Sequence, residues 1–147
     1  MNATHESFRR GIDYDRIPGS HWWSKRKWIL LRECVFNTAV VPNMECGNQY
    51  VQLARDGRLT ERRGYACDGV TLGIDALTSM RGAFVHDGLC QLTEEGLLPW
   101  SYRQQIDRQF FLILVEDQFP EWWSRLRYRA IRIWSRGRQL LSHISAP

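Results

Sequence analysis

The sequence lacks the features that mark several common classes of protein. Its longest apolar run, residues 110–115, falls far short of the roughly 18 uncharged apolar residues that a membrane-spanning helix needs. No apolar stretch follows the charges near the N-terminus, so we expect no signal peptide. Low-complexity tracts are absent as well. These absences argue against a transmembrane segment, secretory export and intrinsic disorder.

Cysteine is present but never occurs as a closely spaced pair. The four positions are Cys34, Cys46, Cys67 and Cys90. A zinc knuckle usually draws its ligands from CxxC pairs, which this spacing does not provide. Because we also expect no export to an oxidising compartment, the sequence favours buried free thiols.

Length and composition fit one domain over residues 1–147. The sequence is 44% hydrophobic and 24% charged, and a chain of this size can bury a single core. Residues 1–21 are expected to form an extended arm, because they contain Gly11, Pro18 and Gly19 and show no periodicity. The net charge of +4 is unevenly distributed along the chain. The segment after Pro120 has six arginines and one acid, a charge of +5, so residues 1–120 sum to −1.

The middle third has the pattern of a small antiparallel sheet. Residues 28–36 fit either a strand or a short buried helix, and 38–41 and 49–53 are short β-rich runs separated by turn formers. Asp56-Gly57 predicts a tight hairpin turn before a strand over 58–63, because both residues tolerate the backbone angles of such turns.

The apolar period changes to that of helices beyond Gly73. It predicts a helix from Asp75 to about Gln91, and Ser101 is a candidate N-cap for a second helix. The apolar positions of that second helix are Ile106, Phe110, Ile113 and Leu114. The short connection predicts that the two helices pack antiparallel.

A last, basic helix is expected after Pro120. Its apolar side is formed by Leu126, Ala130, Ile133, Trp134 and Leu141. We expect this side to pack on the protein, with arginines over much of the rest. The predicted fold class is therefore α+β, with a small antiparallel sheet, an antiparallel helix pair and a basic C-terminal helix.

Three polar residues of the helix pair form a candidate catalytic group. If Asp107 faces the first helix, its carboxylate holds one ring nitrogen of His86 and leaves the other free to take a proton from water. Asp87 lies about 100° around the helix from His86, so it addresses a different neighbour. We predict that His86 and Asp107 are catalytic and that the reaction is ester hydrolysis without a covalent intermediate.

Asp87 is also a candidate ligand for a hard cation such as calcium. Calcium takes several oxygen ligands, and backbone carbonyls of a Gly-rich loop commonly supply them. The segment 64–69 is such a loop, with Tyr65, Cys67 and Gly69 as the candidate ligands beside Asp87. A cation there would polarise an ester carbonyl. For Asp68, an ordinary Asp-Gly turn is the favoured interpretation.

Five segments resemble, in order and spacing, a family of phage and prophage domains of unknown function. They are Gly64-Tyr65, Asp68-Gly69-Val70-Thr71, His86-Asp87-Gly88-Leu89, Asp107-Arg108-Gln109-Phe110, and Ile131 to Gly137. Thr71 and Cys90 stand where that family usually has serine and tyrosine. The resemblance implies a phage-encoded protein, associated with the virion or tail, whose partners are other phage structural proteins. It would lie in the virion or the host cytoplasm.

The same polar group resembles the calcium-dependent secretory phospholipases and the viral capsid phospholipase domains. The resemblance implies that His86 is the general base, that Asp107 orients it, and that Asp87 is a calcium ligand. The disulfide framework of the secretory enzymes is not present. The functional prediction is a phospholipase-like site that hydrolyses lipid or another ester, with membrane lipid as a partner.

The sequence leaves two alternatives open. His86 and Asp107 also fit a buried polar network in a non-catalytic structural or adaptor subunit of a phage particle. The arginine-rich last helix fits a solvated face, a surface for nucleic acid or acidic protein, or an interfacial membrane helix. The solvent accessibility of His86 distinguishes a catalytic site from a buried polar network.

Overall fold

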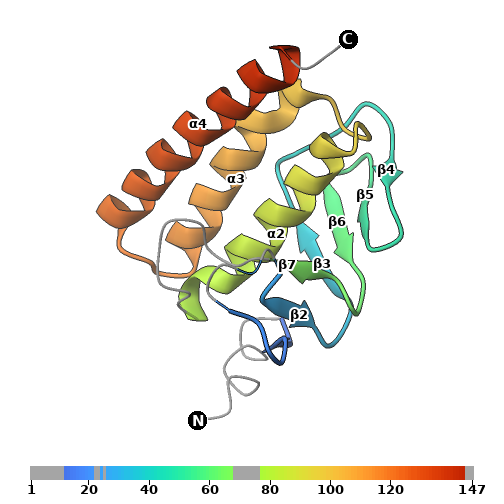
Figure 1. Cartoon of the computed structure of the whole chain (residues 1–147), viewed down its shortest axis with the longest axis vertical. Helices are drawn as coiled ribbons and strands as arrows, with labels where there is room; N and C mark the ends of the chain where they lie inside the picture. Colours follow the sequence, from blue (N-terminus) through green and yellow to red (C-terminus); the bar gives the residue numbers. More distant parts are fainter. Residues whose placement is uncertain (1–11, 22–23, 25, 68–76, 145–147) are drawn as a thin grey trace.

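The fold combines two small antiparallel sheets with three helices that lie side by side (Figure 1). The computed structural model describes residues 12–21, 24, 26–67 and 77–144. Within them, the predicted α+β class, the antiparallel helix pair and the C-terminal helix are confirmed. The prediction of a single sheet is incomplete, because the strands separate into two groups.

The sheets have the strand orders β1-β2-β7 and β3-β6-β5-β4, and every pair is antiparallel. The strands are β1 (Tyr14–Arg16), β2 (Trp28–Leu30), β3 (Cys34–Asn37), β4 (Cys46–Gly47), β5 (Val51–Leu53), β6 (Arg58–Glu61) and β7 (Ala66–Cys67). Residues 28–36 thus form strands rather than a helix. Because β1 pairs with β2 and buries Tyr14, the predicted arm does not extend through residue 21. Residues 1–11 lie outside the described part.

The helices follow one another outward from the sheets, with α3 between α2 and α4 (Figure 1). They are α2 (Leu77–Glu94), the short 3-10 helix η1 (Trp100–Tyr102), α3 (Arg103–Glu116) and α4 (Glu121–Ile144). Ser101 lies inside η1, and α3 begins at Arg103 without a side-chain cap, so the N-cap prediction for Ser101 is wrong. No described helix is long and apolar enough to cross a bilayer.

The predicted hairpin turn at Asp56-Gly57 joins β5 to β6. Gly57 has a φ of 85°, and the Asp56 carboxylate accepts a hydrogen bond from the Arg58 amide. The Thr38 hydroxyl donates to the Gly57 carbonyl at 2.7 Å. Residues 38–41 are therefore a loop that braces this turn, and not the strand that their composition predicts.

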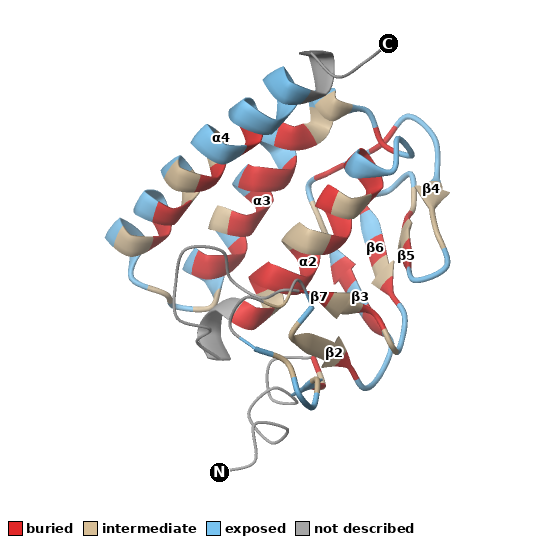
Figure 2. Ribbon diagram, viewed as in Figure 1, coloured by how far each residue is buried: buried red, intermediate tan, exposed pale blue. Residues whose placement is uncertain are grey.

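The core lies between α2 and the sheets and continues toward α3 (Figure 2). Leu53 and Leu59 face Phe84 and Leu89 there, and all four are fully buried. The expected apolar positions of α3 are buried as well; these are Ile106, Phe110, Ile113 and Leu114. All four cysteines are free thiols, as predicted, and Cys46 alone among them is only partly buried.

Gly88 sits where α2 crosses a buried carboxyl group. Strand alternation puts Glu61 on the same face of β6 as Leu59, and its side chain is fully buried. A Cβ at Gly88 would collide with the Glu61 Oε1 atom. Neither carboxyl oxygen has a hydrogen-bond partner among the described residues. Burial, with a smaller contribution from the charge of Asp87, therefore raises the pKa of Glu61 well above its ordinary value.

Glu61 should make the stability of the protein fall as the pH rises. Its folded-state pKa is raised, so the folded chain keeps a proton that the unfolded chain loses above its ordinary pKa of 4.5. The free energy of unfolding should fall between that pH and the raised folded-state pKa. Urea denaturation across this range should show this slope in the wild type and its loss in Glu61→Gln. The exposed Glu33→Gln should keep the slope, and a slope that survives in Glu61→Gln contradicts the assignment.

The last helix faces the opposite way from the prediction. Leu126, Ile133 and Trp134 are exposed, whereas the side against α3 carries Ser124, Ile131 and Ser135 (Figure 2). Ile131 packs in an apolar cluster with Phe110 and Leu114 of α3, and Ser135 accepts a hydrogen bond from Arg103. One apolar residue and partnered polar groups thus take the place of the expected apolar stripe in the packing of α4.

Candidate functional site

His86, Asp107 and Arg132 meet from three different helices. His86 Nε2 lies 2.8 Å from Asp107 Oδ1, and an Arg132 N–H donates to Asp107 Oδ2 at 2.9 Å. Asp107 is fully buried, whereas the His86 side chain keeps 12% of its surface exposed. The predicted contact between His86 and Asp107 is therefore confirmed. Arg132 was expected to lie on the solvated side of its helix, so its place in the group is new.

Helical spacing explains how α2 and α3 build this contact. Phe110 lies three residues after Asp107, on the same side of α3, and its ring packs against the imidazole with centroids 5.2 Å apart. Cys90 lies four residues after His86 and reaches the same ring. The imidazole is thus confined between α2 and α3, and rotation away from Asp107 is blocked.

A second arginine extends the group on the buried side. Arg103 Nε lies 3.8 Å from Asp107 Oδ1, and the same guanidinium donates to Thr93 and Ser135 at 3.2 Å each. The spacing of four residues between Arg103 and Asp107 on one helix is the sequence signal that predicts such a pair. The Asp107 carboxylate is therefore surrounded by three positively charged or proton-donating groups.

These contacts change the protonation of both central residues. Burial alone would raise the pKa of Asp107, but hydrogen bonds from His86 and Arg132 hold it below its ordinary value. Burial alone would lower the pKa of His86, but the adjacent Cys90 sulfur and the carboxylates of Asp107 and Asp87 together raise it well above 6.5. The group therefore favours the protonated imidazole and the ionised carboxylate.

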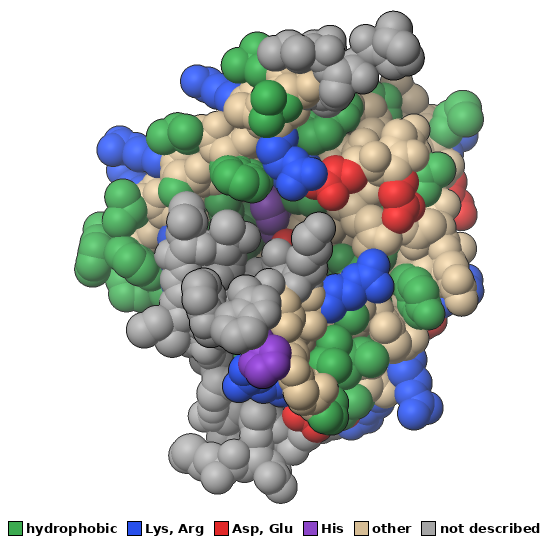
Figure 3. Space-filling view, viewed as in Figure 1, with side chains coloured by type: hydrophobic (Ala, Val, Ile, Leu, Met, Phe, Trp, Pro, Cys, Tyr) green, Lys and Arg blue, Asp and Glu red, His purple; other side chains and the backbone are tan. Residues whose placement is uncertain are grey.

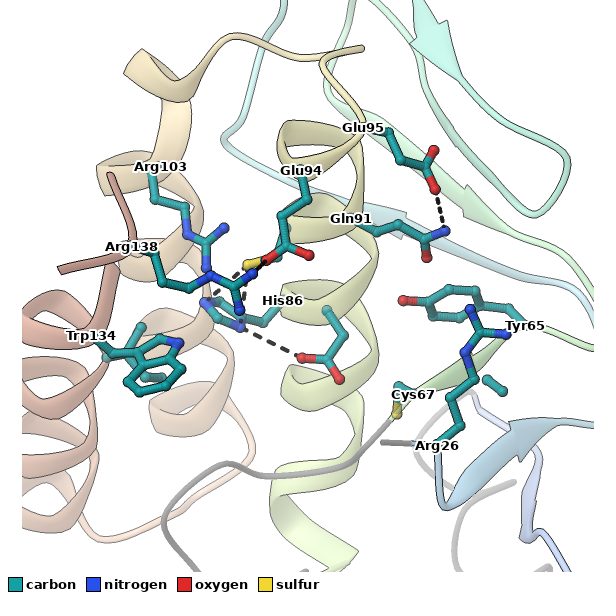
Figure 4. A pocket seen from close by; sticks show the side chains of 14 residues that line it. Arg26, Tyr65, Cys67, His86, Gln91, Glu94, Glu95, Arg103, Trp134 and Arg138 are labelled. Atoms are coloured by element: carbon teal, nitrogen blue, oxygen red, sulfur yellow. Dashed lines mark hydrogen bonds and ion pairs between the residues drawn. The ribbon is translucent and has the colours of Figure 1, made fainter. Parts of the chain in front are cut away.

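The imidazole borders a pocket of about 760 Å³ between α2, α4 and the β7 end of the first sheet (Figure 4). Asp87 lines the pocket too, with its Oδ1 atom 3.8 Å from His86 Nδ1. That separation is too long for a direct hydrogen bond, but it suits a water that bonds to both groups. The remaining walls combine apolar side chains with charges of both signs, and Arg138 is paired with Glu94 at 3.3 Å. They include Arg26, Arg138, Glu94, Glu95, Tyr65, Ile131 and Trp134.

Two of the three carbonyls expected to bind calcium, those of Tyr65 and Cys67, take part in strand pairing. The Tyr65 and Cys67 carbonyls accept backbone hydrogen bonds from Leu30 and Lys27 at 2.9 and 2.8 Å. They belong to the β2–β7 pairing and point toward β2, so the prediction that they ligate calcium with Asp87 is not supported. Gly69, the third expected carbonyl, lies outside the described residues together with Asp68 and Thr71. We derive no catalytic step through a calcium ion.

His86, Cys90 and Asp107 offer an alternative metal-ligand group, with ligand atoms within 4.8 Å of one another. The positive charges of Arg103 and Arg132 oppose a cation at this position. In addition, the 2.8 Å separation of His86 Nε2 and Asp107 Oδ1 is that of a hydrogen bond. The geometry therefore fits a proton-holding network better than a metal centre.

Cys90 is not placed as a nucleophile paired with His86. Its Sγ atom lies 3.6 Å from both ring nitrogens. A sulfur in the ring plane at equal distances from both would overlap Cε1, so the thiol lies against the ring face. A thiol activated by histidine instead lies in the ring plane, along a nitrogen lone pair. Water is thus the better candidate for the nucleophile.

No family model, curated protein or solved structure matches the chain at a significant level. The fold and the site define an α+β protein with a buried carboxylate that holds a histidine at the wall of a pocket. The resemblance to phage domains and to phospholipases remains a prediction.

Proposed function

We propose that the chain is a hydrolase that uses His86 as a general base to activate water against an ester. One observation carries the proposal: Asp107 fixes one nitrogen of the imidazole at 2.8 Å, while the ring lies at the wall of a pocket beside Asp87. A histidine held in this way has a fixed orientation and tautomer, which general-base catalysis requires.

The reaction uses both nitrogens of the ring. His86 Nε2–H donates to Asp107, and Nδ1 removes a proton from a water held between it and Asp87 Oδ1. The water oxygen bonds to the ester carbonyl carbon and forms a tetrahedral oxyanion. When the intermediate collapses, the alkoxide leaves with the proton from Nδ1. The products are one acid and one alcohol. Arg26 is the pocket arginine that would supply positive charge for the oxyanion, since Arg103 lies beside Asp107 and Arg138 is paired with Glu94.

The lining of the pocket favours a phospholipid among esters. Tyr65, Ile131 and Trp134 offer apolar and aromatic surface for an acyl chain (Figure 4). Arg26 offers a cation for a phosphate, whereas Arg138 is paired with Glu94. Its volume of about 760 Å³ is within the range of small-molecule sites. A phospholipid combines these two chemistries in one substrate.

The pH dependence of hydrolysis tests this mechanism. Only neutral His86 accepts a proton, and its pKa is raised, so activity should increase with pH until it passes that pKa, above 6.5. Fatty acid release from vesicles of phosphatidylcholine and phosphatidylglycerol measures the rate. Asp87→Asn should shift the rising part of the pH–rate profile to lower pH, because it removes a negative charge beside the imidazole. No release from these vesicles, or a rate that falls as the pH rises through this range, contradicts the proposal.

A structural subunit of a phage particle is the second candidate. The observation that favours it is the buried network itself, in which Arg103 links Thr93 on α2 to Ser135 on α4 while Arg132 holds Asp107. Such a network fixes three helices without any chemistry. In that case His86→Gln should lower stability, and the wild type should release no fatty acid.

A further inference from the structure

An apolar stripe runs along the outward side of α4. Trp122, Leu126, Ile133 and Leu140 have exposed fractions of 69%, 51%, 74% and 66%. With 3.6 residues per turn, these four positions lie within about 40° of one another around the helix. Ser124, Ile131 and Ser135, which are buried, lie on the opposite side. The stripe is therefore a continuous feature of the surface and does not consist of scattered apolar residues.

Arginines border this stripe on one flank. Arg125, Arg129 and Arg136 are exposed there, whereas Arg138 lies about 120° or more around the helix from the stripe, beside the pocket. Figure 3 shows hydrophobic and basic side chains following one another along the edge of the molecule that α4 forms. The single acid of the helix, Glu121, is paired with Arg125. Arg138 is likewise paired with Glu94, so among the described residues the net positive charge beside the stripe comes from Arg129 and Arg136.

We propose that this stripe docks on an anionic membrane surface, with α4 lying in the plane of the bilayer. Apolar side chains bordered by arginines are the pattern of an interfacial helix, in which the apolar face enters the acyl boundary and the cations meet lipid phosphates. A second copy of the chain fits less well, because two such helices face to face would bring their arginines together. Charge complementarity selects the anionic lipid.

The docking surface is separate from the pocket. Trp134, Arg138 and Ile131 line the pocket, and helical spacing places them about 80° to 180° around α4 from the stripe. The inference therefore does not depend on the proposed function.

Vesicle flotation with the full chain tests the inference. The wild type should float with vesicles of equal parts phosphatidylcholine and phosphatidylglycerol, and on the order of 100-fold weaker binding is expected after Arg125, Arg129 and Arg136 are all changed to Gln. Leu126→Glu with Ile133→Glu should abolish flotation. Met44→Glu is the matched control, because Met44 is 75% exposed away from α4 and should leave flotation unchanged. Circular dichroism checks that each variant is folded.

The same assay separates docking from catalysis. His86→Gln should float as the wild type does, so a failure of the hydrolase proposal leaves the binding result intact. Equal binding to pure phosphatidylcholine, or flotation that survives the double glutamate variant, overturns the inference. A dimer in size-exclusion chromatography that the double variant dissociates, without any vesicle binding, also overturns it in favour of self-association.

Discussion

Replacing His86 with glutamine should lower the rate of ester hydrolysis by about 10²- to 10⁴-fold, the contribution of a positioned general base. The glutamine amide can keep a hydrogen bond to Asp107, but it has no nitrogen that accepts a proton at neutral pH. The α2–α3 contact is then preserved while the chemistry is lost. Fatty acid release from mixed phosphatidylcholine and phosphatidylglycerol vesicles measures the effect.

A structural role for His86 would give a different result. His21→Gln is the matched control, because His21 is exposed and lies far from the group along the chain, and its rate should equal that of the wild type. The residual hydrolysis by His86→Gln should also no longer increase with pH, because that increase comes from deprotonation of His86. A variant that keeps both the rate and its increase with pH would show that His86 is not the base.

Local spacing carried enough information to predict the central contact. A short connection between two amphipathic helices requires them to pack antiparallel, and that packing brings His86 opposite Asp107. The burial of Phe110 and Ile113 follows from the same helical period. The hairpin at Asp56-Gly57 also follows from local chemistry, since few residues tolerate a φ near 85°.

The direction of α4 was not predictable in this way. Its period places Leu126 and Ile133 on one side of the helix, but periodicity does not say whether that side meets the protein or its surroundings. The preference of apolar residues for the core gave the wrong answer, because tertiary polar contacts of Ser135 and Arg132 decided the packing. Ser135 lies 32 residues from its partner Arg103, and Arg132 lies 25 residues from Asp107, so local patterns do not reveal these contacts.

The site's outer parts depend on tertiary context for the same reason. Strand β7 has only two residues, too few to show an alternation pattern. Its pairing with β2 could therefore not be predicted from the sequence. The direction of the Tyr65 and Cys67 carbonyls depends on that pairing, so it could not be predicted either. Glu61 alternates with Leu59, but a charged residue is so rarely buried without a partner that its residue type alone would indicate a solvent-facing position. The requirement for glycine at position 88 comes from the close approach of that carboxyl group, which no local pattern shows.

Asp107→Asn should lower the free energy of unfolding by about 3–5 kcal/mol, the usual cost of removing one partner from a buried ion pair. The carboxylate is fully buried and compensates the charges of Arg132 and His86, which the amide cannot do. Urea denaturation at neutral pH measures the loss. Asp15→Asn is the control, because Asp15 is exposed on β1 and its substitution should leave stability within the experimental error.

The same carboxylate should stabilise the wild type in a pH-dependent way. The folded-state pKa of Asp107 is lowered, so its contribution is complete above the ordinary pKa of 3.8 and is lost as the pH falls through the lowered value. Arg132→Met in the Asp107→Asn background should recover part of the stability, because it removes a cation that the first change leaves uncompensated. If the two substitutions are additive instead, the arginine and the carboxylate do not act as a pair, and α4 is held to α3 by other contacts.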